Sequence, residues 1–188
     1  MAGRLRTVLL GAPGSGKGTQ AERVARRLAV PAISTGEMLR QAVAEGSELG
    51  SRVASVMAAG LLVDDDLMGA VVRERLGRGD AAAGFILDGY PRTTCQAATL
   101  DSVLSGREGG LDAVVLLEVP EEVLLRRALA RQRADDKEEV VRQRLELYHE
   151  KTEPLISHYG DRGLLLRIDG NRSMDEVTDA ILRSLEAA

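Results

Sequence analysis

The chain has 188 residues, a length that fits one domain with an ordinary hydrophobic core. Its 25 basic and 29 acidic residues leave a net charge of -4, so no overall basic field attracts nucleic acid or an anionic membrane. Aromatic residues make up only 2%, which argues against a base-stacking surface. The single cysteine, Cys95, excludes an internal disulfide and a cysteine-rich zinc site, so we expect no zinc. No apolar run approaches the roughly 20 residues that span a bilayer, and the apolar run near the start is too short for a secretory signal. We therefore expect a cytoplasmic protein without membrane or nucleic-acid partners.

Short apolar runs alternate with helical patterns along the chain. The runs predicted as strands cover residues 7–11, 31–34, 84–89, 112–119 and 164–169. Helices are predicted at 17–28, 36–45, 48–59, 64–77, 93–104, 121–131, 136–158 and 174–186. The strands are almost unbroken in hydrophobicity, which is typical of a parallel sheet covered on both faces. We therefore predict an α/β fold, a doubly wound sheet with ligands at the carboxyl ends of its strands. The two consecutive helices within 36–59 interrupt the alternation and predict a small helical insert.

The stretch from Gly11 to Lys17 reads G-x-x-x-x-G-K, between a predicted strand and a predicted helix. This is the context of a phosphate-binding loop, in which glycines let backbone N–H groups turn inward and the helix start adds a positive dipole. The chain has 22 Arg but only three Lys, so a lysine at position 17 indicates a need for a compact ammonium group. The position that usually carries a Ser or Thr ligand of Mg²⁺ is Gly18. A metal must then be held in another way.

Two further segments are predicted to reach the same edge of the sheet. Asp88 ends a strand and is a candidate to hold Mg²⁺ through water, with a turn aspartate as the alternative, and Arg92 follows shortly after it. In "ISTGEMLR", Ser34 or Thr35 is expected to cap a helix. Arg40 lies one turn further along that helix and is a candidate for contact with a ligand anion.

Six arginines lie within residues 126–144, interleaved with acidic residues. A solvated, salt-bridged helix surface explains such a pattern on composition alone. The alternative is a set of phosphate donors, because Arg127 and Arg131 are four residues apart on one helix face, and arginine forks match phosphate oxygens.

Five segments together resemble the adenylate kinase family over nearly the whole chain. They are "GAPGSGKGTQ", "ISTGEMLR", "GFILDGYPRTTCQA", "RADDKEEVVRQRLELYHEKTEPLI" and "IDGN". The resemblance implies a phosphate-loop kinase fold and reversible phosphoryl transfer from Mg·ATP to AMP, giving two ADP. It also implies an AMP-binding helical insert at 34–63 and, at 131–136, the remnant of a lid.

The resemblance assigns residues to the two nucleotide sites. The ATP-site residues that it implies are Gly14, Ser15, Gly16, Lys17, Gly18, Thr19, Arg127, Arg131 and Arg172. The AMP-site residues that it implies are Thr35, Arg40, Leu61, Leu62, Val63, Gly89, Tyr90, Pro91, Arg92, Gln96, Arg133 and Arg144. The implied catalytic residues are Lys17, Arg92, Arg133, Arg144 and Asp88, with Asp88 holding the waters of Mg²⁺.

Thr35 and Gln96 favour AMP over pyrimidine nucleotides, because a Gln amide can pair with the adenine edge as both donor and acceptor. Relatives that act on UMP and CMP typically have Ala and Asn at these two positions. A GTPase switch is excluded because the only Asn, Asn171, begins no N-K-x-D motif. A nucleotide-binding module without catalysis remains an alternative.

Only Gln132 separates Arg131 from Arg133, where relatives carry a lid. Lids exclude water and complete the charge around the phosphates. A monomer is the family default, and a neighbouring subunit that covers the site is the alternative expectation.

Overall fold

The computed structural model describes residues 5–105, 109–131 and 137–188. Within them, five parallel strands form one sheet in the order β2-β3-β1-β4-β5. The strands are β1 (Leu5–Leu10), β2 (Ala32–Ser34), β3 (Gly84–Asp88), β4 (Ala113–Glu118) and β5 (Leu165–Asp169). The predicted α/β class and each predicted strand are confirmed.

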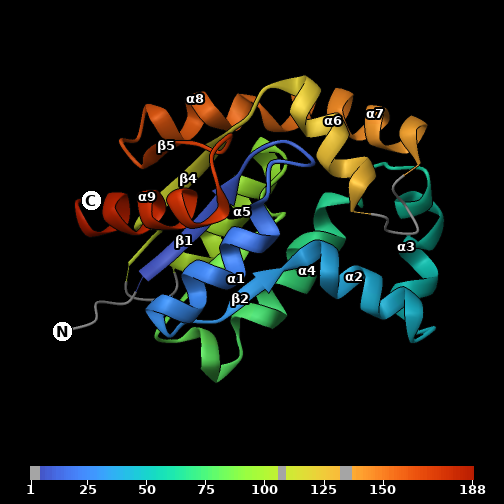
Figure 1. Cartoon of the computed structure of the whole chain (residues 1–188). Coiled ribbons are helices and arrows are strands. Elements are labelled where there is room, and N and C mark those ends of the chain that lie inside the picture. Colours follow the sequence, from blue (N-terminus) through green and yellow to red (C-terminus); the bar gives the residue numbers. More distant parts are fainter. Residues whose placement is uncertain (1–4, 106–108, 132–136) are drawn as a thin grey trace.

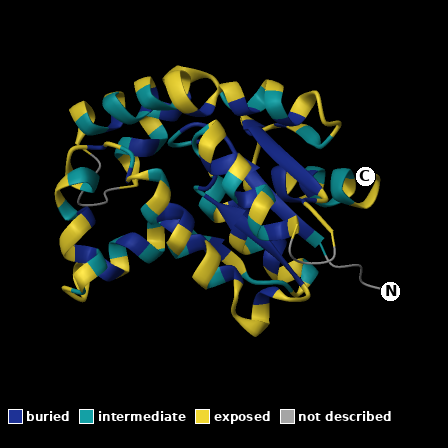
Figure 2. Cartoon of the chain, turned by 180° about the vertical axis from the view of Figure 1, so that it is seen from behind, coloured by how far each residue is buried: buried dark blue, intermediate teal, exposed yellow. Residues whose placement is uncertain are grey.

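Helices cover both faces of the sheet (Figure 1). Helices α1 (Lys17–Leu28) and α9 (Met174–Glu186) pack on one face, around Leu9, Val115 and Ile181. On the opposite face, Val8, Val114 and their neighbours pack against α4 (Asp65–Leu76), α5 (Thr94–Ser105) and α8 (Pro154–Gly160). Adjacent strand residues are thus buried on opposite faces, which explains the unbroken apolar runs. Figure 2 shows the central strands mostly in blue, surrounded by helices whose residues are a mixture of blue, teal and yellow. None of the helices in the described segments is long and apolar enough to cross a membrane.

The predicted helical insert consists of α2 (Thr35–Ala44) and α3 (Glu48–Ala58). The two helices approach each other closely at Gly50, where a Cβ atom would lie 2.0 Å from the carbonyl oxygen of Ala42. Ser47 caps α3 by accepting a hydrogen bond from the N–H of Gly50 at 3.1 Å. The insert lies beyond the β2 end of the sheet, opposite α6 (Glu121–Ala130) and α7 (Glu138–Leu147), as Figure 1 shows.

The single helix predicted over 136–158 is wrong in one respect. Helix α7 passes into a π-helical turn, η2 (Tyr148–Thr152), before α8 begins at Pro154. Proline has no N–H to donate to the preceding turn, so a regular α-helix cannot continue through it. The N–H of Glu153 instead donates to the carbonyl of Tyr148 at 2.8 Å, five residues back. The residues before Pro154 therefore wind more widely than an α-helix.

Candidate active site

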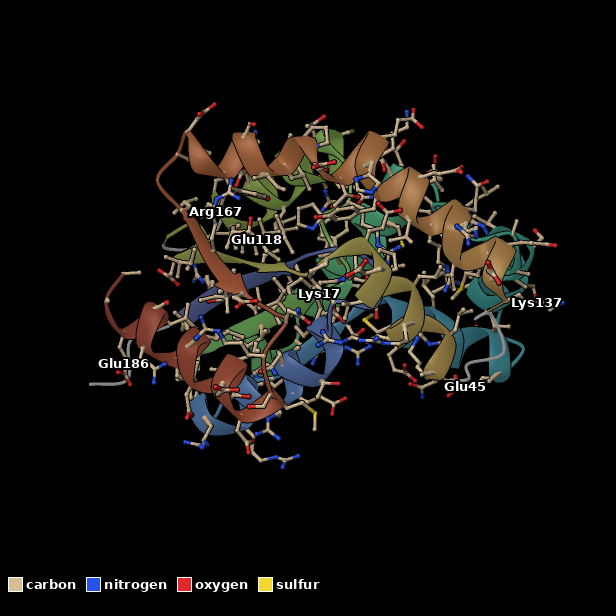
Figure 3. All side chains as sticks on the ribbon, turned by 45° about the horizontal axis from the view of Figure 1, so that its top comes forward. Lys17, Glu45, Glu118, Lys137, Arg167 and Glu186 are labelled. Carbon is tan, nitrogen blue, oxygen red and sulfur yellow. The ribbon has the colours of Figure 1, made fainter. Side chains whose placement is uncertain are left out.

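A cleft of about 760 Å³ lies at the carboxyl ends of the strands, between the insert and the helices α6 and α7. Lys17 lies near the centre of the molecule in Figure 3, at the start of α1. Residues from every predicted site segment in the described chain line this cleft. Of the residues predicted for ATP, those that line it are Gly14, Ser15, Gly16, Lys17, Gly18, Thr19, Arg127, Arg131 and Arg172. Of the residues predicted for AMP, those that line it are Thr35, Arg40, Leu61, Leu62, Val63, Gly89, Pro91, Arg92, Gln96 and Arg144, and Asp88 lines it too.

The phosphate loop turns on glycines with a left-handed backbone. Gly14 has φ 87° and Gly16 has φ 93°, values that residues with a Cβ rarely adopt. A Cβ at Gly14 would lie 2.3 Å from the carbonyl oxygen of Leu124 in α6, so the loop packs directly against that helix. Gly16 has open space around it and immediately precedes α1. The N–H groups at the start of α1 therefore face the cleft, as an anion site requires.

The ammonium group of Lys17 is held over the loop. Its Nζ donates to the carbonyl oxygens of Gly11 at 2.5 Å and Ala12 at 2.9 Å. Desolvation in the cleft lowers the pKa of Lys17 to about 8, an effect that Asp88 opposes and Arg92 and Arg131 reinforce. A nearby phosphate would favour the charged form, because opposite charges raise the pKa of an ammonium group.

Asp88 and Ser34 end neighbouring strands in register and are bonded to each other. Ser34 Oγ donates to Asp88 Oδ2 at 3.1 Å, and Thr35 Oγ1 donates to the carbonyl of Asp88 at 3.4 Å. Ser34 occupies the N-cap position of α2 as expected, but its side chain makes no capping hydrogen bond and donates to Asp88 instead. A Cβ at Gly18 would lie 3.6 Å from Asp88 Oδ2, which puts the carboxylate beside the phosphate loop.

This arrangement fits water-mediated binding of Mg²⁺. A carboxylate oxygen is the ligand chemistry that Mg²⁺ prefers, and Mg²⁺ usually keeps several of its waters. Asp88 is 9% exposed, lines the cleft beside Gly18 of the phosphate loop, and is oriented by Ser34. In the described chain no cluster of three or more His, Cys, Asp or Glu side chains forms a metal cage. Asp88 is therefore suited to hold metal-bound waters that accompany a nucleotide.

Arg92 and Gln96 are linked by a hydrogen bond in the lining of the cleft. The N–H of Arg92 donates to Gln96 Oε1 at 2.8 Å, and Arg92 Nε donates to the carbonyl of Gly89 at 2.8 Å. Desolvation lowers the pKa of the Arg92 guanidinium, which Asp88 partly offsets, while Arg144 and Arg40 lower it further. Several cationic side chains thus face one desolvated space, which is costly unless an anion binds among them.

The remaining predicted arginines enter the cleft from three other elements. Arg127 in α6 donates from Nη1 to the carbonyl of Gly170 at 2.9 Å, which joins α6 to the loop after β5. Arg40 in α2 forms an ion pair with Glu37 at 2.8 Å. Arg144 in α7 donates from Nη2 to the carbonyl of Met57 at 3.4 Å. Arg131 follows directly after α6 and lines the cleft. The alternative of a purely solvated arginine surface is therefore wrong for the half-buried Arg127 and Arg144, whereas Arg131 lines the cleft with an exposed side chain.

Two predicted site residues, Arg133 and Tyr90, are not assigned to the lining of the cleft. Arg133 and most of the expected lid at 131–136 lie outside the described residues. Tyr90 is 1% exposed and belongs to the hydrophobic core rather than to the cleft lining, and its hydroxyl group lies 4.0 Å from the Cβ position of Gly69 in α4. We therefore no longer assign the side chain of Tyr90 to AMP.

Sequence reasoning missed two residues at the site. Thr152 in the π-helical turn lines the cleft and donates from Oγ1 to the carbonyl of Arg92 at 2.8 Å. Asp65 accepts hydrogen bonds from Gln96 and Thr93. The sequence offered a weak signal for the first, since Pro154 inside a helical pattern indicates an irregular turn. It offered none for the second, because an aspartate at a helix start is an ordinary feature.

Known proteins resemble this chain along almost its entire length. A family model described as adenylate kinase matches residues 9–164. An adenylate kinase from Xanthomonas campestris pv. campestris is 50% identical to the chain, over 96% of this chain and 99% of that protein. The chain belongs to the adenylate kinase family. An adenylate kinase from Stenotrophomonas maltophilia is 48% identical over 97% of this chain and the whole of that protein. The fold, the nucleotide-kinase class and the resemblance predicted from the motifs are confirmed.

The relatives differ from one another in length. The match to the Stenotrophomonas maltophilia adenylate kinase runs over 187 residues, so that protein and this 188-residue chain are nearly equal in length. The match to an adenylate kinase from Kosmotoga olearia, 44% identical over 95% of this chain and 98% of that protein, runs over 210 positions. That relative therefore has additional residues that this chain lacks. The short form is shared with other adenylate kinases of similar sequence.

Proposed function

We propose that the cleft carries out the reversible transfer of the γ-phosphoryl group of Mg·ATP to AMP, which yields two ADP. The observation that carries this proposal is the convergence of a phosphate loop and five basic residues, Lys17, Arg92, Arg127, Arg131 and Arg144, on one cleft. These residues come from the start of α1, the turn after β3, α6 with its C-terminal end, and α7, so the charge is assembled by the fold. Phosphoryl transfer requires such an arrangement, because the charge spreads over several oxygens in the transition state.

In this proposal the phosphate loop and Lys17 bind the phosphates of ATP. The left-handed glycines and the start of α1 supply N–H donors, while Lys17 exchanges its carbonyl partners for phosphate oxygens. Arg127 and the loop at Gly170 and Arg172 enclose the adenine of ATP. Mg²⁺ bound with ATP supplies further neutralisation of phosphate charge, and Asp88 holds its waters.

AMP occupies the other half of the cleft, between the insert and the turn after β3. Arg40, Arg92 and Arg144 neutralise its phosphate, and Gln96 pairs with the adenine. An AMP phosphate oxygen attacks the γ-phosphorus, and the bond from that phosphorus to the β-γ bridging oxygen of ATP breaks. The attacking oxygen is already anionic near neutral pH, so positioning and charge stabilisation suffice without a general base. The insert at 34–63, the lid remnant at 131–136 with Arg133, a cytoplasmic location and a monomeric state remain parts of this proposal.

The test is ADP formation by the purified protein from Mg·ATP with AMP, CMP, UMP or GMP as acceptor. We expect AMP to give the highest kcat/KM and Lys17→Met to lower it by about 10² to 10³, the usual effect of losing one preorganised charge donor. Retained folding of the variant, checked by thermal unfolding, makes the loss specific to the site. Faster turnover of CMP than of AMP would contradict the assignment of Gln96 and Thr35. Full activity of Lys17→Met would contradict the role of the phosphate loop.

A further inference from the structure

The amide of Gln96 is held from both ends. Its Oε1 accepts a hydrogen bond from the backbone N–H of Arg92 at 2.8 Å, and its Nε2 donates to Asp65 Oδ1 at 2.8 Å. Gln96 is 2% exposed, yet it lines the cleft. The partners fix which end is oxygen and which is nitrogen, since an N–H group requires an acceptor and a carboxylate requires a donor. The amide of Gln96 therefore faces the cleft in one orientation.

Asp65 is itself placed by contacts at two helix starts. The capping of α4 is done by its neighbour Asp64, whose Oδ1 accepts from the N–H groups of Asp66 at 3.1 Å and Leu67 at 3.0 Å. The carboxylate of Asp65 is turned instead towards α5, where its Oδ2 accepts from Thr93 Oγ1 at 2.9 Å. The same Thr93 oxygen accepts from the backbone N–H of Gln96 at 3.1 Å. Asp65 thus connects the first turn of α4 to the residue that faces the acceptor base.

We propose that Asp65 is a positioning residue that sets base specificity by locking the amide of Gln96. This proposal rests on the assignment of Gln96 to the adenine of AMP. A glutamine amide has two N–H groups and two oxygen lone pairs, and one of each remains after the bonds to Asp65 and Arg92. Their order matches adenine, whose edge offers an amino donor at N6 beside an acceptor at N1.

A 6-oxopurine offers the reverse order, an acceptor at O6 beside a donor at N1. An unlocked glutamine would accommodate it by rotating its amide through half a turn. Here that rotation sets Nε2–H against the N–H of Arg92 and Oε1 against the carboxylate of Asp65. Both contacts are then repulsive, and buried polar groups that lose their partners are costly. The lock therefore discriminates against inosine and guanosine monophosphates.

The sharpest probe is the pair AMP and inosine monophosphate, which differ only at this edge of the base. We compare the ratio of kcat/KM for the two acceptors in the wild type and in Asp65→Asn. The asparagine amide can donate as well as accept, so it removes one of the two repulsive contacts of the rotated Gln96 and leaves only the contact with the N–H of Arg92. We expect the AMP preference to fall at least tenfold, with most of the AMP effect in KM and little in kcat. A general weakening of the fold would lower kcat/KM for both acceptors by the same factor and leave their ratio unchanged.

Two further variants separate this inference from the proposed function. Asp66→Asn is the matched control, with the same loss of charge in the same helical turn but at a carboxylate that is not a partner of Gln96. We expect it to keep the wild-type ratio. Gln96→Ala removes the amide itself and should abolish most of the preference. A ratio that falls in Gln96→Ala but stays unchanged in Asp65→Asn overturns the role of Asp65 and leaves Gln96 in place. A ratio unchanged in both overturns the assignment of Gln96 as well.

Discussion

Gly14→Ala and Gly16→Ala form a matched pair that tests how the phosphate loop is held. Both glycines have a left-handed backbone, with φ 87° and 93°, so an alanine at either position pays a similar conformational cost of about 1–2 kcal/mol. Only the first meets an obstacle, because its new Cβ would lie 2.3 Å from the carbonyl oxygen of Leu124. Around Gly16 there is open space. We therefore expect Gly14→Ala to be the more destabilising substitution.

The expected difference follows from the packing term alone. Forcing a methyl group into a closely packed contact costs about 1–3 kcal/mol, so Gly14→Ala should lose about 2 kcal/mol more than Gly16→Ala. For a chain of this size each kcal/mol corresponds to about 2–4 °C in Tm, so the Tm of Gly14→Ala should lie about 4–8 °C below that of Gly16→Ala. Urea and thermal unfolding of both variants, without nucleotide, measure this difference. Equal losses in the two variants would refute the close contact between the loop and α6.

Three further predictions concern the site. Because burial lowers the pKa of Lys17 from 10.5 to about 8, the folded protein binds this proton less tightly than the unfolded chain. The buried ammonium group of Lys17 therefore lowers the free energy of unfolding below pH 8, and this loss declines between pH 8 and 10.5. Because Lys17 loses its charge in the folded protein above pH 8, kcat/KM for Mg·ATP should fall there. A kcat/KM for Mg·ATP that stays constant up to pH 9.5 would contradict the lowered pKa of Lys17. Asp88→Asn should raise the Mg²⁺ concentration for half-maximal rate and for half-maximal nucleotide binding by about tenfold, with a smaller rise in Ser34→Ala. Unchanged Mg²⁺ dependence in both would remove Asp88 from the metal site. Gly50→Ala, whose Cβ would lie 2.0 Å from the Ala42 carbonyl, should separate α2 from α3. It should raise KM for AMP about tenfold, corresponding to 1.4 kcal/mol, with little change for ATP. Equal rises in both KM values would show that the insert does not serve AMP alone.

Local patterns in the sequence were sufficient for the strands, most of the helices and the phosphate loop. Apolar runs and helical periodicity act within a few residues, and the loop is a contiguous motif whose glycines and Lys17 carry its chemistry. Composition and spacing left a solvated helix surface and a set of phosphate donors as alternatives for the arginines, and the family resemblance favoured the phosphate donors. Their convergence on one cleft became visible only when α6, α7 and the turn after β3 were placed together.

The tertiary structure alone decided which partners the polar side chains take. Ser34 reads as a helix cap in the sequence, yet its hydroxyl group bonds to Asp88, which is 54 residues away. Asp65 and Gln96 are separated by 31 residues and meet because the starts of α4 and α5 lie together. A side-chain hydrogen bond depends on positions within about 3 Å, which no short-range pattern encodes. The sequence by itself determined the kinase fold and the phosphate-binding loop. The packing of distant segments decided how the carboxylate and amide side chains are oriented.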